Sequence, residues 1–421
     1  MSTAAGVRKA VRTMRTEGLD GVVDRLTRSA VRRFGVEVEP LLLRASDVVD
    51  SQHLPTPPAG PTPPRGSALD IGWVLTPPAA GSGGHTTIFR LVEALEAAGH
   101  RCVLYLYDTG TGSLAEREQV IRRWWPRVRA EVRDVADGLP DMDAWVATAW
   151  QTAHVLARRG DVRGRRFYLA QDFEPYFYGR GSAYELAEDS YRFGFRMLTV
   201  GHMVADELQE HLGLTSTVLP FGCDQDVYRV TNEGARNEVV FYARPGTPRR
   251  GFELAVMALE EFSRRRPDVV INTFGVAARR LPFPAVVHSG LHPRELNELY
   301  NRCAAGLAMS FTNISLIAYE LLAAGVVPVV NDWRGSRADL DNPFVAWSRP
   351  TPGALADALV QSVDRAPDVS AQRVTRSVRD VTWGVAHRTV VSAIEAACYD
   401  AEISTDPEIS ADPEFEKVGD A

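Results

Sequence analysis

The strongest constraint on the fold is an alternation of short apolar runs with amphipathic stretches, which repeats along most of the chain. It starts at residues 70–76, whose apolar run predicts a strand. A glycine-rich loop follows, and then a helix at 87–98 that Gly99 would end. Strands separated by helices predict parallel β-sheets joined by right-handed crossovers. We therefore expect an α/β fold.

The alternation forms two successive series, which predicts two doubly wound domains at residues 67–222 and 223–382. A length of 421 residues suits two domains with extensions, because one domain usually holds about 100–200 residues. Ligands of such sheets bind beyond the carboxyl ends of the strands, so we expect the chemistry in a cleft between the two domains. The other predicted strands are 101–107, 144–149, 167–170, 197–200, 216–219, 238–243, 269–274, 286–288, 306–309 and 326–330.

Composition excludes several classes of protein. The chain is 45% hydrophobic and 24% charged, which excludes wholesale disorder, a fibrous repeat and a polytopic membrane protein. A net charge of −7 argues against nucleic acid as the main partner. The four cysteines contain no C-x-x-C pair and no apolar leader opens the chain, so we expect reduced thiols in a cytoplasmic protein.

The two ends of the chain differ from its middle. Residues 1–54 are expected to form a basic helical extension and residues 55–66 a proline-rich linker. The eight basic residues of 1–33 accompany an apolar helical face, which would either contact an anionic membrane surface or pack against the main body. Residues 401–421 hold seven acids and predict a disordered tail.

The loop after the first predicted strand contains Gly81, Gly83, Gly84 and His85. Glycines there let backbone N–H groups approach an anion at the start of a helix, although a tight turn would need them too. A dinucleotide-binding fingerprint would require glycine at position 86, which is threonine. Asp108 nevertheless ends the second strand where a ribose-binding acid would lie, so an NAD-dependent oxidoreductase using Gly81 to Gly84 remains an alternative.

A second loop follows the first strand of the second domain and carries two cations, Arg244 and Arg249, across a Pro/Gly turn. Both guanidinium groups can point at one pyrophosphate, and each charge-assisted hydrogen bond contributes roughly 1.5–3 kcal/mol. The alternative is a pair of solvated surface arginines, because the chain is rich in arginine.

A third loop, at residues 310–315, leads from a strand into a helix that Gly325 would end. Asn313 or Ser315 can cap this helix, whose free N–H groups form another anion site. Glu320 is an acid on an otherwise apolar helix, so it should have a hydroxyl or arginine partner.

The second and third loops, together with Leu-Pro-Phe-Gly-Cys-Asp at 219–224 and Trp-Gly at 383–384, resemble the GT-B glycosyltransferases of family four. The resemblance covers roughly residues 67–400 and implies a terminal helix at 383–400 that crosses back to the first domain. Within it, residues 171–177 and 242–249 resemble bacterial rhamnosyltransferases of surface polysaccharide synthesis, which use dTDP-L-rhamnose.

The resemblance also implies roles for individual residues. Arg244 and Arg249 would hold the diphosphate, with Arg249 stabilising the leaving group, and Glu320 would bond the pentose. The family's pattern has two glutamates eight residues apart, and the first falls on Thr312, which puts a charged contact to a sugar hydroxyl in doubt. The remaining donor contacts would come from Asn313, Ile314 and Ser315, and from Gly83 and Gly84 of the opposite domain.

Residues of the first domain supply candidates for the acceptor side. Asp172 follows the predicted strand 167–170 and would accept the acceptor's proton, orient the acceptor or cap the next helix. Glu174 is a weaker candidate. The aromatic residues 176–178 would stack on sugar rings or pack into the core. His85 would bond the sugar or serve the structure.

We expect a glycosyltransferase that moves a 6-deoxyhexose, L-rhamnose, from a dTDP-sugar to a glycan or lipid-linked glycan. The sequence has no H-E-x-x-H motif and no cysteine/histidine cluster, so we expect a metal-independent enzyme without a cofactor. The alternatives are a UDP- or GDP-hexose transferase of the same fold, the oxidoreductase, and a non-catalytic glycan-binding protein.

Overall fold

The computed structural model describes residues 42–58, 60–110, 112–275 and 281–399. The basic stretch 1–33 and the acidic tail 401–421 lie outside these residues, so the predictions about them stay predictions. The chain divides into two units after Val48. Among its described residues the first unit has one short 3-10 helix, η1 (Ala45–Asp47), and everything below concerns the second unit.

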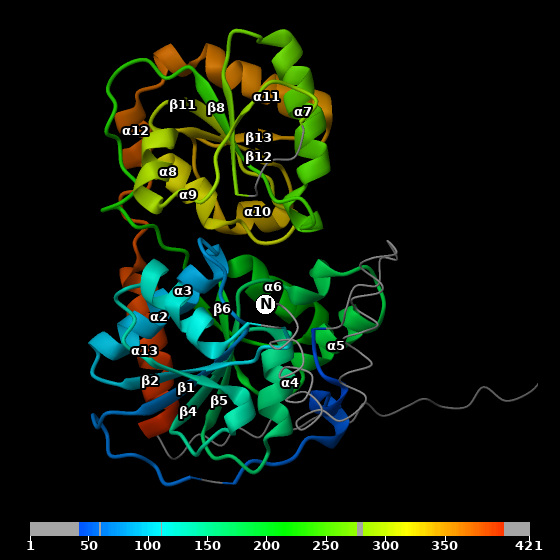
Figure 1. Ribbon diagram of the computed structural model, residues 1–421, viewed down its shortest axis with the longest axis vertical. Coiled ribbons are helices and arrows are strands. Elements are labelled where there is room, and N and C mark those ends of the chain that lie inside the picture. Colours follow the sequence, from blue (N-terminus) through cyan, green and yellow to red (C-terminus); the bar gives the residue numbers. More distant parts are fainter. Residues whose placement is uncertain (1–41, 59, 111, 276–280, 400–421) are drawn as a thin grey trace, which may run out of the picture. The chain divides into compact units, whose positions relative to one another are not determined.

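The first domain is built on a seven-stranded sheet in the order β3-β2-β1-β4-β5-β6-β7, in which every neighbouring pair is parallel. Helices lie on both sides of the sheet, which is why its central strands are buried almost throughout (Figure 1). The strands are β1 (Asp70–Leu75), β2 (Arg101–Leu106), β3 (Glu131–Asp134), β4 (Ala144–Ala147), β5 (Arg165–Ala170), β6 (Arg196–Val200) and β7 (Thr217–Leu219). Its helices are α2 (Gly83–Ala97), α3 (Leu114–Trp124), α4 (Trp150–Arg158), α5 (Ser182–Ser190) and α6 (His202–Leu212), with 3-10 turns η2 (Ser51–His53), η3 (Val135–Asp137) and η4 (Glu174–Phe177).

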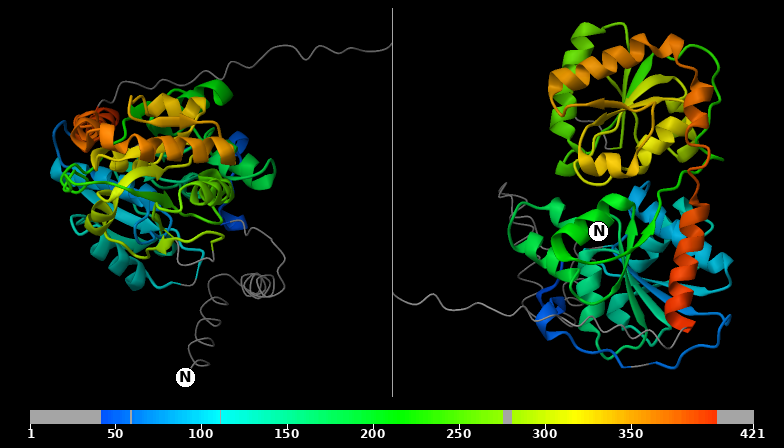
Figure 2. Two further views of the ribbon diagram at one scale, coloured as in Figure 1. Left: turned by 90° about the horizontal axis from the view of Figure 1, so that it is seen from above. Right: turned by 180° about the vertical axis from the view of Figure 1, so that it is seen from behind.

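The second domain repeats this plan with six parallel strands in the order β10-β9-β8-β11-β12-β13, again with helices on both sides (Figure 2). The strands are β8 (Glu238–Tyr242), β9 (Ile271–Phe274), β10 (Val286–Val287), β11 (Cys303–Leu307), β12 (Val327–Asn331) and β13 (Ala346–Ser348). The helices are α7 (Phe252–Arg265), α8 (Pro293–Tyr300), α9 (Leu316–Ala323), α10 (Arg334–Asp339), α11 (Pro352–Asp364) and α12 (Ala371–Arg376), with 3-10 turns η5 (Pro248–Arg250) and η6 (Ala366–Asp368).

The last helix, α13 (Trp383–Tyr399), follows the second domain in sequence but packs on α2 and β7 of the first. Its far end is tied down by a hydrogen bond from the Tyr399 hydroxyl to the carbonyl of Ser67. Its near end lies over Gly222, where an added Cβ atom would stand 2.5 Å from the ring of Trp383. The indole therefore needs glycine at position 222.

The predicted α/β class with two doubly wound domains is confirmed, but several element boundaries were wrong. The helix expected at 87–98 begins at Gly83, because Ser82 accepts a hydrogen bond from the backbone of His85 and caps it. The strand expected at 306–309 is β11, which begins at Cys303. The strands β3 and β13 were not predicted, since both are short edge strands without an apolar run.

Replacing Gly222 with alanine should lower the free energy of unfolding by about 1–3 kcal/mol, because the new methyl group meets a buried indole. Thermal or urea unfolding measures the change. Gly179→Ala is the matched control, because nothing lies within 4 Å of its Cβ position and the residue is exposed. Equal stability of the two variants would contradict the packing of α13 described above.

Candidate active site

The predicted site residues lie in four loops, each of which follows the carboxyl end of a parallel strand, or in the helices α2 and α9 to which two of these loops lead. These are the loops after β1, β5, β8 and β11. Parallel strands of one sheet end at the same edge, so each domain presents two of the loops at one edge. Hydrogen bonds and one ion pair then join the loop after β5 to the loops after β8 and β11.

Asp172 is the centre of this contact. Its side chain is buried, with 6% of it exposed, and lies among donors from the second domain. One carboxylate oxygen accepts a hydrogen bond from the Thr312 hydroxyl at 2.9 Å, and the other lies 3.4 Å from the backbone N–H of Asn313. The Arg249 Nε atom is 3.5 Å from the first oxygen. Burial raises the pKa of Asp172, and the charges of Arg249 and Arg250 oppose that rise.

The arginine loop supplies three guanidinium groups, of which the sequence analysis named two. Arg249 lies 3.9 Å from the ring centroid of Phe177 and faces Asp172, whereas Arg244 lies 5.5 Å from the ring of Tyr242 in its own domain. In the contacts that the structure gives for its described residues, Arg249 therefore faces the opposite domain and Arg244 does not.

Arg250, the arginine that the sequence analysis did not name, fixes the third loop. Its guanidinium donates to the Ser310 hydroxyl at 2.9 Å, and to the backbone carbonyl and side-chain oxygen of Asn313 at 3.2 and 3.1 Å. Burial and the neighbouring charge of Arg249 lower the pKa of Arg250 to about 10, so it remains a cation at neutral pH. It thus brings a positive charge next to the Asn313 turn.

The start of α9 is built differently from the prediction. Ser315 occupies the N-cap position, but its side chain makes no capping hydrogen bond. Asn313 uses its side-chain amide to bond Arg250 and the carbonyl of Gln171. Ile314 stands between Asn313 and Ser315 in the sequence, and its fully buried side chain anchors the turn. The first N–H groups of α9 are therefore not capped by either residue.

Glu320 has the hydroxyl partner that was expected for an acid on an apolar helix. The Tyr300 hydroxyl donates to its carboxylate at 3.4 Å. Burial raises the pKa of Glu320 to about 7, with a contribution from the negative charge of Asp224, and the tyrosine hydrogen bonds oppose it. Its assigned contact to a pentose remains a prediction.

The glycine loop holds His85 by both ring nitrogens. Nδ1 lies 2.9 Å from the Ser82 hydroxyl and Nε2 lies 3.0 Å from the carbonyl of Thr76. A carbonyl only accepts, so Nε2 carries the proton and donates, and burial lowers the pKa of the imidazole. His85 is a neutral, locally bonded ring in this arrangement, and its sugar contact remains a prediction.

The two glycines of this loop lie at the start of α2. Gly83 is the first residue of the helix and has nothing within 4 Å of its Cβ position. At Gly84 a Cβ atom would lie 3.7 Å from the Gln171 side chain.

Asp108, which the oxidoreductase alternative would require for a ribose, forms an ion pair with Arg117 at 3.1 Å. It also accepts the backbone N–H of Gly110 at 2.7 Å. These local contacts account for an acid at this position without a dinucleotide.

Glu174, the weaker of the two acid candidates on the acceptor side, lies in the interior of the first domain. It is buried, accepts the backbone N–H of Trp150 at 2.6 Å at the start of α4, and has its pKa raised to about 8 by burial. Tyr176 donates to Glu207 at 2.6 Å, and Tyr178 accepts from the Trp150 indole at 3.0 Å. These hydrogen bonds stay within the first domain, whereas the ring of Phe177 contacts Arg249 of the second domain.

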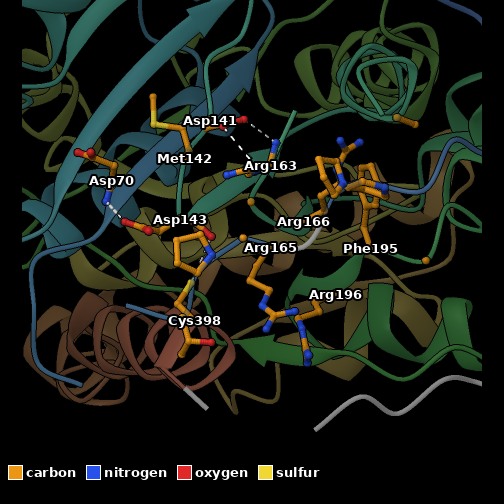
Figure 3. A pocket seen from close by; sticks show the side chains of 18 of the residues that line it. Asp70, Asp141, Met142, Asp143, Arg163, Arg165, Arg166, Phe195, Arg196 and Cys398 are labelled. Carbon is orange, nitrogen blue, oxygen red and sulfur yellow. Dashed lines mark hydrogen bonds and ion pairs between the residues drawn. The ribbon is translucent and has the colours of Figure 1, made fainter. Parts of the chain in front are cut away.

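A cavity of about 590 Å³ lies at the edge of the first sheet where its strands begin, opposite the edge that carries the site loops (Figure 3). The proline-rich segment passes along it, and Pro55 lies so near Gly160 that a Cβ there would be 2.2 Å from the proline ring. Arg165 and Arg196 line it at the starts of β5 and β6. None of the predicted site residues lines this cavity.

Within the described residues, no three His, Cys, Asp or Glu side chains are placed to hold a metal ion. Over the same residues no helix is long and apolar enough to cross a membrane. All four cysteines are buried and free.

Two family models match parts of the chain. The model of the WsaF C-terminal domain matches residues 237–360, and that of the WsaF N-terminal domain matches residues 129–202. Among curated proteins, the O-antigen biosynthesis protein RfbC of Myxococcus xanthus is 30% identical over 322 residues. The match covers 70% of this chain and 25% of RfbC, so the chain spans about a quarter of that relative.

Solved structures share the fold. Anabaena HepE, determined in complex with UDP-glucose, covers 78% of this chain and 100% of its own with a TM-score of 0.61 and 11% identity. WaaG, a glycosyltransferase involved in lipopolysaccharide biosynthesis, covers 77% and 99% with a TM-score of 0.56 and 15% identity. The GT-B fold expected from the sequence is thereby confirmed.

The raised pKa of Glu320 makes a prediction about stability and pH. Between pH 4.5 and 7 the folded protein keeps a proton on Glu320 that the unfolded chain has lost. The free energy of unfolding should therefore fall as pH rises through this range, and it should fall less steeply in Glu320→Gln. Urea unfolding across the range measures this, with Glu298→Gln on the exposed side of α8 as control. If the free energy of unfolding falls with pH at the same slope in Glu320→Gln and in wild type, the raised pKa of Glu320 is refuted.

Proposed function

We propose that this chain is a glycosyltransferase of polysaccharide biosynthesis that moves a 6-deoxyhexose, L-rhamnose, from a dTDP-sugar to a glycan or lipid-linked glycan. One observation carries the proposal: Arg249, the Arg250-braced turn and the backbone N–H of Asn313 converge on a single carboxylate. A group of donors that holds one oxyanion can hold another. The GT-B fold and a relative named for O-antigen biosynthesis support the same class of reaction.

In the proposed reaction these donors hold the diphosphate of the sugar nucleotide. As the bond between sugar and phosphate breaks, negative charge grows on the leaving diphosphate. Arg249 supplies a planar fork of N–H groups, Arg250 a second positive charge, and the Asn313 backbone a fixed dipole. Because these groups neutralise the charge themselves, the proposed reaction needs no metal ion.

The choice of donor sugar has its own basis in the sequence. It depends on residues 171–177 and 242–249, which resemble rhamnosyltransferases. HepE was solved with UDP-glucose, so a UDP- or GDP-hexose is the alternative donor. The ion pair of Asp108 with Arg117 disfavours the oxidoreductase. Contact of residues 1–33 with an anionic membrane surface on the cytoplasmic side remains part of the proposal.

Arg249→Ala should lower turnover by a factor of about 10² or more, because each tenfold corresponds to roughly 1.4 kcal/mol of lost transition-state stabilisation. The assay is hydrolysis of dTDP-L-rhamnose, UDP-glucose and GDP-mannose, in which water takes the sugar in place of the glycan acceptor and nucleoside diphosphate is released. It is run with and without EDTA, and NADH oxidation is measured in parallel. Arg265→Ala is the control, because this exposed arginine of α7 is paired with Asp357 at 2.7 Å.

Each arm decides a different part of the proposal. Release from UDP-glucose or GDP-mannose alone would replace the donor but keep the reaction class, and loss of turnover with EDTA would refute metal independence. NADH oxidation would favour the oxidoreductase. Release from none of the donors would contradict the proposed function, and normal turnover of Arg249→Ala would remove that residue from the mechanism.

A further inference from the structure

The carboxylate of Asp172 is itself an anion held by the second domain. It belongs to the loop after β5, yet its two oxygens are bonded by Thr312 and Asn313, which are 140 and 141 residues away in sequence. Arg249 adds an ion pair to the same carboxylate. We call Arg249, Thr312 and the backbone N–H of Asn313 the anion cradle.

The anion cradle has room for one oxyanion at a time. The Asn313 backbone has a single N–H, which points at Asp172. The Arg249 Nε atom is buried 3.5 Å from the same carboxylate, where it forms an ion pair, and it has no hydrogen-bond partner. A phosphate oxygen that used these groups would have to replace the carboxylate of Asp172, because a hydrogen-bond donor serves one acceptor well.

We propose that Asp172 is a built-in stand-in for the donor's diphosphate: it occupies the anion cradle before the donor arrives, and donor binding displaces it. The identity of the displacing anion rests on the proposed function, whereas the displacement itself rests on the contacts of Asp172. Competition of this kind weakens the apparent affinity for the anion by the fraction of molecules in which the cradle is free.

Displacement would also move the Asp172 carboxylate to a second position, where it can bond the acceptor. A carboxylate that loses its partners inside a buried region is costly, so it must find water, a proton or a new donor. The hydroxyl of an acceptor sugar would be such a donor. The exchange makes the Asp172 carboxylate accessible only after the donor is bound, which imposes an order of donor first and acceptor second.

A second contact between the domains provides a matched control. Asp339, at the end of α10, accepts hydrogen bonds from the backbone N–H groups of His202 and Met203 at 2.6 and 3.0 Å. It is also a buried carboxylate held by backbone amides of the other domain, but it bonds neither Arg249 nor the Asn313 turn. Removing its charge loosens the domains and leaves the anion cradle occupied.

The test is calorimetric titration of the full chain with inorganic pyrophosphate and, separately, with dTDP. Asp172→Asn should bind both about tenfold more tightly than wild type, the equivalent of roughly 1.4 kcal/mol, while Asp339→Asn stays within about twofold. Asp172→Ala serves as a second variant with the same expected direction, and thermal unfolding verifies that each variant is folded.

Weaker or unchanged pyrophosphate binding in folded Asp172→Asn and Asp172→Ala would overturn the inference, as would equal tightening in Asp339→Asn. The two proposals fail separately. If pyrophosphate binding tightens as expected but no nucleoside diphosphate binds any variant, displacement stands and the proposed donor class falls. If nucleotides bind wild type and Asp172→Asn equally, the stand-in role falls and the proposed function stands.

Discussion

The contact between the Asp172 carboxylate and donors of the second domain is the interaction on which the account of the site depends. A buried carboxylate without partners is strongly destabilising, so its partners must be in place whenever the loops are in this arrangement. Thr312, Asn313 and Arg249 supply them. The residues that satisfy this one acid are the residues that we propose hold a phosphate of the donor.

The parallel sheets explain why these groups can meet. Each sheet ends all its strands at one edge, and each loop at that edge leads into a helix or a 3-10 turn. Asp172 lies after β5, Arg249 in the turn η5 after β8, and Thr312 between β11 and α9. Three short loops thus carry the residues of the proposed site, while α13 ties the last part of the chain to the first domain.

Much of the fold could be predicted from the sequence because apolar runs mark buried parallel strands. The failures have physical causes. β3 reads Glu-Val-Arg-Asp and lies at a sheet edge, so only one face of it needs apolar side chains. β11 begins with Cys303 and two alanines, whose small side chains fit a crowded sheet but carry no strand signal.

The site was predictable residue by residue only in part. Periodicity and loop position identified Arg249, Asn313 and Glu320, but sequence cannot say which of two adjacent arginines faces which partner. The turn η5 sends Arg249 toward Asp172 and Arg250 toward Ser310. The pairing of Asp172 with Thr312 spans 140 residues and depends on tertiary contacts that no local pattern encodes.

The most direct test of the anion cradle is a crystal structure of the chain with dTDP bound. The account predicts that the β-phosphate lies within hydrogen-bond distance of the Asn313 backbone N–H and the Arg249 guanidinium, with the Asp172 carboxylate moved away from both. A nucleotide bound elsewhere, or phosphates seated while Asp172 keeps its bonds to Thr312 and Asn313, would contradict it.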